Sequence, residues 1–231
     1  MLLGNGLLAK MFIEYQEDPS LIIFASGVSN SSDTSQVNFD REKKLLIKTI
    51  TENKAKKIVY FSSCDVIYAN KIDIPYYFHK IEMEKIIQTH AQQYHIFRLP
   101  QIIGYSENRN SLLNFFIESI KSQTEIKIFK NAYKSLIDID DIYNISRYLI
   151  NNKNSTNKII NIFNPNFYNV QNILYTIEKL LKEEAKVVLL EQGFKPDYLY
   201  SELLQEINVT FDEGYLKRSI FKHYKQKLEE N

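Results

Sequence analysis

The feature that most limits the fold of this chain is an alternation of two kinds of segment along nearly its whole length. Short runs rich in β-branched and aromatic residues are separated by segments whose apolar residues recur every three or four positions. The first pattern predicts buried strands and the second predicts amphipathic helices. We expect strands at 21–26, 57–63, 95–100, 125–130, 158–163 and 186–191, preceded by a short one at 1–3. We expect helices at 6–16, 39–53, 76–92, 110–122, 139–151, 169–182 and 197–206.

This alternation predicts an α/β fold in which a parallel sheet carries helices on both faces, as in doubly wound proteins. With 231 residues, of which 44% are hydrophobic, the chain can bury one sizeable core and a smaller lobe beside it. None of the breaks between segments is long enough, or rich enough in glycine, proline and serine, to be a flexible linker. We therefore expect the smaller lobe to be packed on the first part and not independent of it.

The charge balance and the cysteine count exclude several classes of protein. Lysine and arginine total 29 and aspartate and glutamate 28, interspersed along the chain, which argues against a nucleic-acid partner. One cysteine cannot form an internal disulfide, and no apolar run approaches the roughly 20 residues that span a bilayer. The apolar start is short and lacks a small-residue cleavage site, so it is a poor signal peptide. We expect a cytoplasmic protein with no membrane association.

The first chemical motif lies at the start of the chain and reads Gly4-x-Gly6-x-x-Ala9, between the short first strand and a helical pattern. Its spacing fits the dinucleotide-binding motif of a strand–turn–helix unit, in the variant with alanine at the third position. Gly4 would permit the tight turn, Gly6 would let backbone N–H groups approach a pyrophosphate, and Ala9 would let the helix pack closely on the strand. An ordinary strand-to-helix turn explains the same residues equally well.

The acidic residue that usually follows this motif by about 20 positions is missing. That distance falls in LIIFASGVSNSSD, where the strand ends in Ser26 and Gly27, and the nearest acids, Glu17 and Asp18, precede the strand. Either 21–26 is the second strand of the sheet and meets the cofactor ribose in another way, or the chain has lost a strand–helix–strand portion and passes directly to a later strand. A βαβ unit takes roughly 30 residues, and the short distance from the glycines to this strand favours the loss.

The second chemical motif is Tyr76-x-x-x-Lys80, at the start of the helix expected at 76–92. Residues four apart lie on one face of a helix, so the two side chains would be neighbours. An ammonium beside a phenol stabilises the phenolate and lowers the tyrosine pKa from about 10 toward the working range, which makes the tyrosine a usable acid or base. Because the chain has 16 tyrosines, a half-exposed helix face also explains this pair when it is considered alone.

The motifs taken in order resemble the extended short-chain dehydrogenase/reductase family, which holds nucleotide-sugar epimerases, dehydratases and reductases. The resemblance rests on the glycine motif, then IIFASGVSNS, IVYFSSCDVIYA, Tyr76-x-x-x-Lys80-x-x-x-Glu84 and FRLPQIIG. It continues through YKSLIDIDDI, where a strand runs into a helix with Asp141, then IINIFNPNFYNVQNILYTIEKLL and a closing helix in DEGYLKRSIFKHY.

The resemblance implies a Rossmann-like doubly wound parallel sheet with a small C-terminal α/β substrate lobe. A shortened NAD(P)-binding domain would occupy 1–165, and the substrate-binding lobe would occupy 166–231. The implied cofactor is NAD or NADP, the implied substrate is a nucleotide sugar, and the helices at 39–53 and 76–92 would form a homodimer. The four histidines lack zinc-like spacing, so no metal site is expected.

The resemblance also implies roles for single residues. Tyr76 would be the catalytic acid/base, and Lys80 would bind the nicotinamide ribose and tune Tyr76. Cys64 occupies the position of the family's catalytic serine or threonine. Ser63 would then substitute for it, or Cys64 would orient the substrate weakly, or the redox chemistry would be reduced. As a purely structural residue, Cys64 would be a small buried side chain at a strand end.

The resemblance also implies which residues contact the cofactor, namely Gly4, Gly6, Leu7, Ala25, Ser26, Ser62, Tyr76, Lys80, Leu99 and Pro100. Leu99 and Pro100 can equally be interpreted as a strand end and its turn.

Asp65 and Val66 bear on the type of reaction. In the family's 4,6-dehydratases an aspartate and a glutamate follow the catalytic threonine, and this chain has Asp65 but Val66 in place of the glutamate. We therefore expect a sugar-nucleotide epimerase or reductase that transfers hydride at a sugar carbon. The alternative is a catalytically degenerate family member that acts as a binding or scaffolding protein, which Cys64 and the missing ribose acid favour.

Overall fold

The computed structural model describes residues 1–108, 111–204, 207 and 209–229. The chain forms two compact units: unit 1 is Met1–Leu99, Asp140–Ile162 and Leu199–Ile207, and unit 2 is Pro100–Ile139, Phe163–Tyr198 and Asn208–Asn231. The boundary expected at residue 165 does not coincide with this division. The chain passes between the units several times, and the strand and helix patterns of Pro100–Ile139 look like those of unit 1, so the sequence pattern does not mark the crossings.

Unit 1 is built on a five-stranded parallel sheet with the order β1-β2-β3-β4-β8. Its strands are β1 (Leu2–Leu3), β2 (Leu21–Phe24), β3 (Lys57–Ser63), β4 (Tyr94–Leu99) and β8 (Lys158–Asn161). The three central strands are buried along nearly their whole length, because layers of the protein cover both faces of the sheet. The expected α/β fold with a parallel sheet is confirmed.

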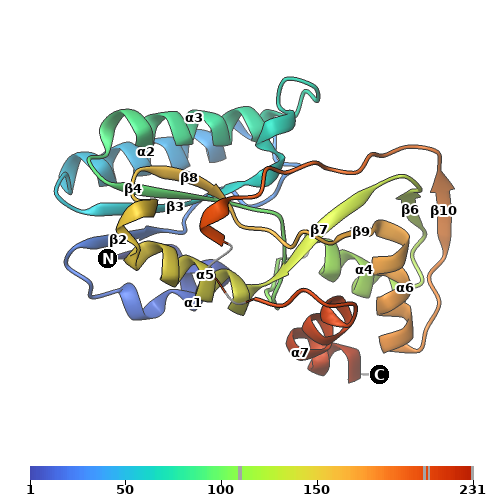
Figure 1. The fold of residues 1–231 in the computed structure, drawn as a ribbon. Helices are drawn as coiled ribbons and strands as arrows, with labels where there is room; N and C mark the ends of the chain where they lie inside the picture. Colours follow the sequence, from blue (N-terminus) through green and yellow to red (C-terminus); the bar gives the residue numbers. More distant parts are fainter. Residues whose placement is uncertain (109–110, 205–206, 208, 230–231) are drawn as a thin grey trace. The chain divides into compact units, whose positions relative to one another are not determined.

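Helices cover both faces of this sheet (Figure 1). On one face lie α2 (Gln36–Glu52) and α3 (Pro75–His90), and on the other lie α1 (Leu7–Met11) and α5 (Ile139–Asn151). The side chains of β3 alternate between the two layers.

Tyr60 and Phe61 of β3 show this alternation directly. The Tyr60 hydroxyl hydrogen-bonds to Glu42 of α2 and Lys80 of α3. Phe61 instead packs on Phe12, the residue that follows α1, with ring centroids 5.2 Å apart. The region around α1 therefore lies on the face opposite to α2 and α3.

The connections between the strands do not all have the same hand. The order runs in one direction from β1 to β4, so the first three connections step toward the same side of the sheet. Because α1 lies on the face opposite to α2 and α3, the first connection has the opposite hand to the next two. Crossovers between parallel strands are right-handed in about 98% of cases. The connection from β1 through α1 to β2 is therefore not an ordinary βαβ unit.

This topology bears on the two explanations for the missing acidic residue that would contact the cofactor ribose. If β2 were the second strand of a sheet ordered 3-2-1-4, the chain would reverse direction and β1 would have neighbours on both sides. Among the described strands β1 has one neighbour, and β2 begins an unbroken run to β4. The strand order agrees with the second explanation, in which the chain passes directly from β1 to a later strand.

A continuous apolar layer fixes α2 and α3 on the sheet. Leu46 and Ile50 of α2 pack with Met83 and Ile87 of α3 against sheet residues that include Ile58. Burying each such side chain contributes about 1.5–3 kcal/mol relative to leaving it exposed. This layer therefore sets the positions of the polar residues on the same two helices.

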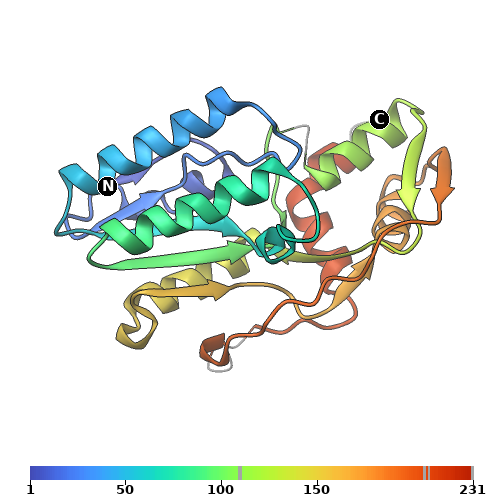
Figure 2. The same ribbon diagram turned by 90° about the horizontal axis from the view of Figure 1, so that it is seen from above.

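Unit 2 contains two small sheets (Figures 1 and 2). One is formed by β5 (Gln101–Ile103), β7 (Tyr133–Asp138) and β9 (Phe167–Asn169), and the other by the parallel pair β6 (Ile126–Phe129) and β10 (Val187–Leu190). The helices are α4 (Leu112–Lys121), α6 (Val170–Leu181) and α7 (Tyr215–Glu229), and their apolar faces share one core. The implied closing helix is confirmed as α7. None of the described helices of either unit is long and apolar enough to cross a bilayer.

Three expectations about single elements need correction. The helix expected at 6–16 is the five-residue α1 followed by a 3₁₀ helix at Ile13–Tyr15. The strands expected at 125–130 and 186–191 form as β6 and β10, but they pair with each other and not with the main sheet. The helix expected at 197–206 is only a 3₁₀ turn at Glu202–Leu204, and residues 205 and 206 lie outside the described part of the chain. Further 3₁₀ helices occupy Cys64–Tyr68 and Lys153–Ser155.

Tertiary contacts explain why no helix begins at residue 197. The Tyr198 ring packs on Phe163 and Phe167, with centroids 5.3 and 5.4 Å apart. The next residue, Leu199, accepts a hydrogen bond at its carbonyl from the Asn161 side chain at 3.0 Å. These contacts hold the segment extended and override its helical spacing.

The burial of His95 in β4 predicts a pH dependence of stability. His95 is fully buried and its Nε2 lies 2.9 Å from Ser155 Oγ. Burial and the nearby Lys57 ammonium lower its pKa from about 6.5 to about 4. Below pH 6.5 the unfolded chain binds a proton that the folded protein does not bind, so stability falls as the pH drops toward 4. We expect a loss of about 3 kcal/mol across this window, measured by urea unfolding.

The control for this prediction is His95→Gln, which keeps a hydrogen-bonding side chain but cannot titrate. Its stability should fall less steeply between pH 6.5 and 4 than that of the unmodified protein. Equal slopes in the two proteins would contradict the assignment to His95.

Candidate functional site

The candidate site lies at the carboxyl edge of the unit 1 sheet, where the parallel strands all end. The register places Phe24 beside Tyr60 and Ser63 beside Leu99. In open α/β sheets this edge is where ligands bind. The structure brings together at this edge most of the residues expected to serve the site, namely Gly4, Gly6, Leu7, Ala25, Ser26, Ser62, Ser63 and Leu99. Pro100, also expected there, is the first residue of unit 2.

The two glycines of the first motif have different surroundings. Gly4 has a φ of +121°, and a Cβ atom there would lie 2.3 Å from the Ala25 carbonyl oxygen. Only glycine fits where the chain leaving β1 passes against the end of β2. At Gly6 a Cβ atom would have nothing within 4 Å, so a ligand could approach the backbone there. Because α1 has only five residues, its dipole adds little attraction for an anion.

Tyr76 and Lys80 lie on the buried side of α3. The helix begins at Pro75, whose fixed φ suits the first helical position and places Tyr76 in the first turn. The exposed fractions of Tyr76 and Lys80 are 7% and 2%, and the ammonium lies 5.7 Å from the centroid of the Tyr76 ring. The spacing therefore produces a neighbouring pair, and the pair is buried where an ordinary helix face would be half-exposed.

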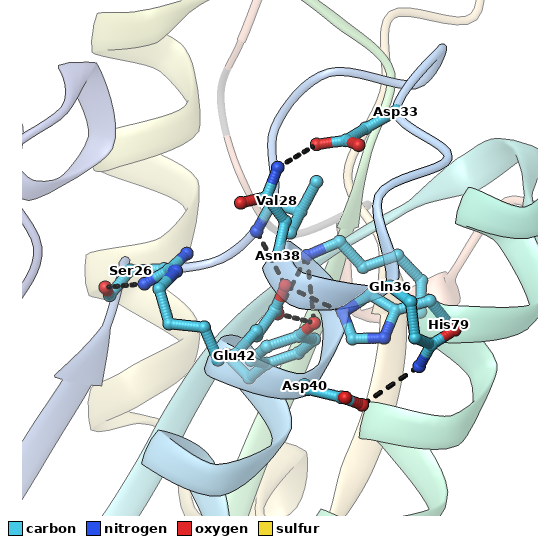
Figure 3. A network of polar contacts seen from close by, with 11 residues as sticks. Ser26, Val28, Asp33, Gln36, Asn38, Asp40, Glu42 and His79 are labelled. Atoms are coloured by element: carbon cyan, nitrogen blue, oxygen red, sulfur yellow. Dashed lines mark hydrogen bonds and ion pairs between the residues drawn. The ribbon is translucent and has the colours of Figure 1, made fainter.

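The Lys80 ammonium is held by groups that no sequence motif marks. Its Nζ donates to Glu42 Oε1 and to the Tyr60 hydroxyl, each at 3.0 Å. The fully buried Glu42 carboxylate also accepts from the Val28 N–H and the Tyr60 hydroxyl, both at 2.6 Å, and hydrogen-bonds to His79 Nε2 at 2.9 Å. Figure 3 shows Glu42 at the centre of these contacts, with Val28 and His79 on different sides of it.

The pKa of Glu42 reflects this environment. Burial favours the neutral carboxyl, but the Lys80 ammonium and the hydrogen bonds from His79, Tyr60 and Val28 outweigh it and lower the pKa to about 2. Glu42 is therefore ionised at neutral pH, and it forms a buried ion pair with Lys80.

Tyr76 does not show the lowered pKa that the Tyr-x-x-x-Lys spacing led us to expect. Burial raises its pKa above the ordinary value, and the nearby carboxylates of Glu42 and Asp65 raise it further. The Lys80 charge does not offset these effects, because Glu42 neutralises it at close range. In this structure the Tyr76 phenol is protonated at neutral pH.

A second buried polar group lies behind the end of β3. The Ser62 hydroxyl donates to Glu84 Oε1 at 2.6 Å, and Arg98 binds both Glu84 oxygens, at 2.9 and 2.6 Å. Glu84 is the acid at the third position of the Tyr76-x-x-x-Lys80-x-x-x-Glu84 pattern. The Ser62 side chain is thus directed into the protein, and only its backbone is left to contact a cofactor.

Cys64 begins the 3₁₀ helix Cys64–Tyr68, Ser63 is the last residue of β3, and the two have different environments. The buried Cys64 thiol donates to the Arg98 carbonyl oxygen at 3.2 Å, and burial raises its pKa well above the ordinary value. The half-buried Ser63 accepts the Asp65 N–H at its Oγ at 3.2 Å and so caps this helix. The geometry of Cys64 matches a small buried side chain at a strand end. Of the two, Ser63 is the more available to a substrate.

Glu42 could have been found from the sequence. It lies three residues after Phe39 and four before Leu46, so it falls on the apolar stripe of α2. An acid at a core-facing position needs a buried partner. That signal identifies Glu42 as unusual, but it does not identify Lys80 as its partner.

Comparison with known proteins now identifies the family. Residues 16–162, more than half of the 231-residue chain, match the model of the NAD dependent epimerase/dehydratase family. The chain belongs to this family. This match confirms the resemblance drawn from the ordered motifs. A separate search of curated protein sequences gave no significant match.

Solved structures show the same fold at low sequence identity. The UDP-glucuronic acid 4-epimerase from Bacillus cereus, in complex with UDP-glucuronic acid and NAD, has 15% identity and a TM-score of 0.73, over 94% of this chain and 77% of that one. RMD from Pseudomonas aeruginosa, complexed with NADPH, has 14% identity and a TM-score of 0.68, over 93% and 83%. The PbgP3 protein from Burkholderia pseudomallei has 18% identity and a TM-score of 0.73, over 95% and 80%.

In this epimerase/dehydratase family member the matched segment begins at Gln16, after the glycine motif. Family membership therefore rests on β2 and the elements after it. This agrees with the topology, in which the region between β1 and β2 is the part that departs from an ordinary doubly wound sheet.

The unequal surroundings of the two glycines lead to a prediction. Gly4→Ala should destabilise the protein by more than about 1 kcal/mol, because alanine is strained at this φ and its Cβ would collide with the Ala25 carbonyl. The matched control Gly6→Ala should be neutral or stabilising by about 0.4–1 kcal/mol, because it restricts only the unfolded chain. Urea unfolding of both variants measures the difference. Equal losses would mean that the two positions are not distinguished in this way.

The environment of Cys64 leads to a second prediction. Thiol reagents attack the thiolate, and both burial and the raised pKa suppress that form in the folded protein. An aromatic disulfide reagent at pH 8 should therefore leave the native protein unmodified and react once per chain in denaturant, since Cys64 is the single cysteine. Rapid stoichiometric modification of the native protein would show that the thiol is accessible.

Proposed function

We propose that the protein is an NAD(P)-dependent epimerase or reductase acting on a nucleotide sugar, with Tyr76 and Lys80 as its acid–base pair. The observation that carries this proposal is the position of the pair. Lys80 Nζ lies 5.7 Å from the Tyr76 ring, on the helix that follows β3, inside the segment that matches the NAD dependent family. Structural neighbours with NAD, NADPH or UDP-glucuronic acid in their complexes support the choice of cofactor and substrate class.

The residues of unit 1 fit the nicotinamide end of such a cofactor better than the adenosine end. Gly6, Ala25 and Ser26 follow β1 and β2 at the edge where Tyr76 lies, and the space at Gly6 is open. The adenosine end would need strands on the far side of β1, and among the described residues none pairs there. We infer that the nicotinamide and its ribose are bound at this edge and that the adenosine end is held loosely, which lowers affinity.

The nicotinamide, when bound, supplies the acceptor or donor of hydride for a sugar carbon. Tyr76 moves the proton of the hydroxyl on that carbon. Because burial and the carboxylates of Glu42 and Asp65 keep the pKa of Tyr76 high, the phenol is protonated and suited to donate. A protonated Tyr76 supports reduction of a ketone to an alcohol over oxidation of the alcohol. The absence of an acid at Val66 supports an epimerase or reductase over a dehydratase.

A second candidate function is binding or scaffolding without catalysis. It is favoured by the engagement of Lys80 with Glu42, by the inward direction of the Cys64 thiol and by the missing strands beyond β1. Glu42 and Tyr60 take two of the three N–H donors of Lys80, which leaves one donor for a cofactor ribose. Ligand binding separates the two candidates.

A homodimer is part of the proposal. The outer faces of α2 and α3 carry exposed apolar side chains, among them Val37, Ile47 and Phe78, with exposed fractions of 77%, 40% and 46%. A second copy packed on these two helices would cover them. We place this dimer in the cytoplasm, where a single free cysteine stays reduced.

Calorimetric titration with NAD, NADH, NADP and NADPH tests the enzyme proposal. We expect one or more of the four to bind with micromolar to millimolar affinity. Binding of none of them would exclude the enzyme and leave the binding protein.

Tyr76→Phe should abolish turnover of the nucleotide sugar while changing cofactor affinity less than about threefold, because it removes only the hydroxyl that moves the proton. Cys64→Ser should keep or raise activity, because a hydroxyl is a better donor than a thiol. The activity of both variants is measured as product formation in the presence of the nicotinamide nucleotide that binds in the titration. An active Tyr76→Phe with an inactive Cys64→Ser would show that the roles are assigned wrongly.

A further inference from the structure

Glu42 is a buried charge with four hydrogen-bonding partners, and neither the motifs nor the family match assigns it a role. Its two oxygens accept hydrogen bonds from Val28, Tyr60, His79 and Lys80, at 2.6 to 3.0 Å. These donors belong to the loop after β2, to β3 and to α3. A carboxylate with this set of donors is fixed in position and remains ionised.

The contacts of Glu42 also determine where the Lys80 ammonium lies. Nζ donates to Glu42 and to Tyr60, and a Cβ atom at Gly27 would lie 2.8 Å from Nζ and 2.9 Å from Glu42 Oε1. The backbone at Gly27 therefore closes over the ion pair. Lys80 cannot move toward a cofactor without separating from Glu42.

We propose that Glu42 is a positioning residue for the Tyr76–Lys80 pair, holding the ammonium at a fixed distance from Tyr76 and cancelling its charge there. The inference rests on the proposed function, because it concerns the same acid–base pair. It assigns Glu42 an influence on how readily Tyr76 gives up its proton. Glu42 itself touches neither substrate nor cofactor.

The magnitude of the charge effect supports this role. A unit charge at about 6 Å in an effective dielectric of about 20 shifts a pKa by roughly two units. Lys80 Nζ lies 5.7 Å from the Tyr76 ring, so an uncompensated ammonium would favour the phenolate strongly. Burial is the largest cause of the raised pKa of Tyr76, and the Glu42 carboxylate adds to it.

Other titratable groups also face Tyr76, and their effects on its ionisation must be distinguished from the effect of Glu42. They are Asp65 from the 3₁₀ helix after β3, Tyr77 and Lys80 from α3, and Tyr60 from β3. Asp65 has the same sign as Glu42, whereas Glu42 is the acid in the buried ion pair with Lys80. Variants that change the charge of Glu42 and Lys80 separately and together isolate their contribution.

The test measures Tyr76 ionisation directly and needs neither cofactor nor substrate. The full chain is produced with 3-fluorotyrosine, whose phenol is more acidic than that of tyrosine, and its ¹⁹F spectrum is followed against pH. The resonance missing from Tyr76→Phe is that of Tyr76. The variants are Glu42→Gln, Glu42→Asp, and Glu42→Gln combined with Lys80→Met. The matched control is Glu82→Gln, which removes an acid from the exposed pair with Lys43 on the same two helices.

We expect Glu42→Gln to lower the ionisation midpoint of Tyr76 by at least one pH unit, because the Lys80 charge is no longer cancelled. Adding Lys80→Met to Glu42→Gln should raise the midpoint again. Glu82→Gln should leave it unchanged. An unchanged midpoint in Glu42→Gln, or the same midpoint with and without Lys80→Met, overturns the proposal.

Removing one partner of a buried ion pair can prevent folding, and Glu42→Asp covers that case. Aspartate keeps the charge but is one methylene shorter, so the carboxylate retreats from Lys80. The Tyr76 midpoint should fall in the same direction by a smaller amount. If Glu42→Gln does not fold and Glu42→Asp leaves the midpoint unchanged, the proposal is overturned.

The outcome is distinguishable from failure of the proposed function. If no nicotinamide nucleotide binds, the enzyme is excluded, but the ¹⁹F midpoints still decide the role of Glu42. If the enzyme is active, Glu42→Asp should shift the pH profile of kcat toward lower pH with a smaller effect on KM. A parallel fall of activity at every pH, with no shift of the profile, would indicate a structural role only.

Discussion

A charge sealed from water determines how the layers of unit 1 come together. The Glu42 carboxylate, with no exposed surface, is tolerable only because the Lys80 ammonium and three further hydrogen-bonding groups surround it. Its partners come from the loop after β2, from β3 and from α3, so the carboxylate on α2 is satisfied only when all three are in place. The apolar layer brings the helices onto the sheet, and this polar contact fixes their alignment at the carboxyl edge.

The local parts of this arrangement were predictable. The strands and helices around the site follow from hydrophobic period, and the proximity of Tyr76 to Lys80 follows from their spacing on one helix. The partner of Lys80 did not follow, because Glu42 lies 38 residues earlier and no local pattern encodes a contact across two helices. The pKa of Tyr76 was expected to fall, but burial raises it, and the carboxylates of Glu42 and Asp65 raise it further. A spacing of four places an ammonium near a phenol but does not reveal what else neutralises the ammonium.

The elements that the sequence mispredicted share a cause. The segment at 197–206 has helical spacing, yet aromatic contacts of Tyr198 and a hydrogen bond to Leu199 hold it extended. β6 and β10 have ordinary strand patterns, and only their pairing shows that they lie apart from the main sheet. The glycine motif predicted a tight turn at Gly4, and the positive φ there agrees, while the lack of room for a side chain comes from the end of β2. In each case a contact between distant segments decides.

The short strand β1 at the edge of the sheet affects how readily this edge could pair with another chain. A sheet that ends abruptly presents an edge whose backbone groups can template pairing with another chain, and proteins usually protect such edges. Here the edge strand is only Leu2–Leu3, so few unpaired N–H and C=O groups face outward from it. An edge strand this short offers little template for pairing with a strand of another chain.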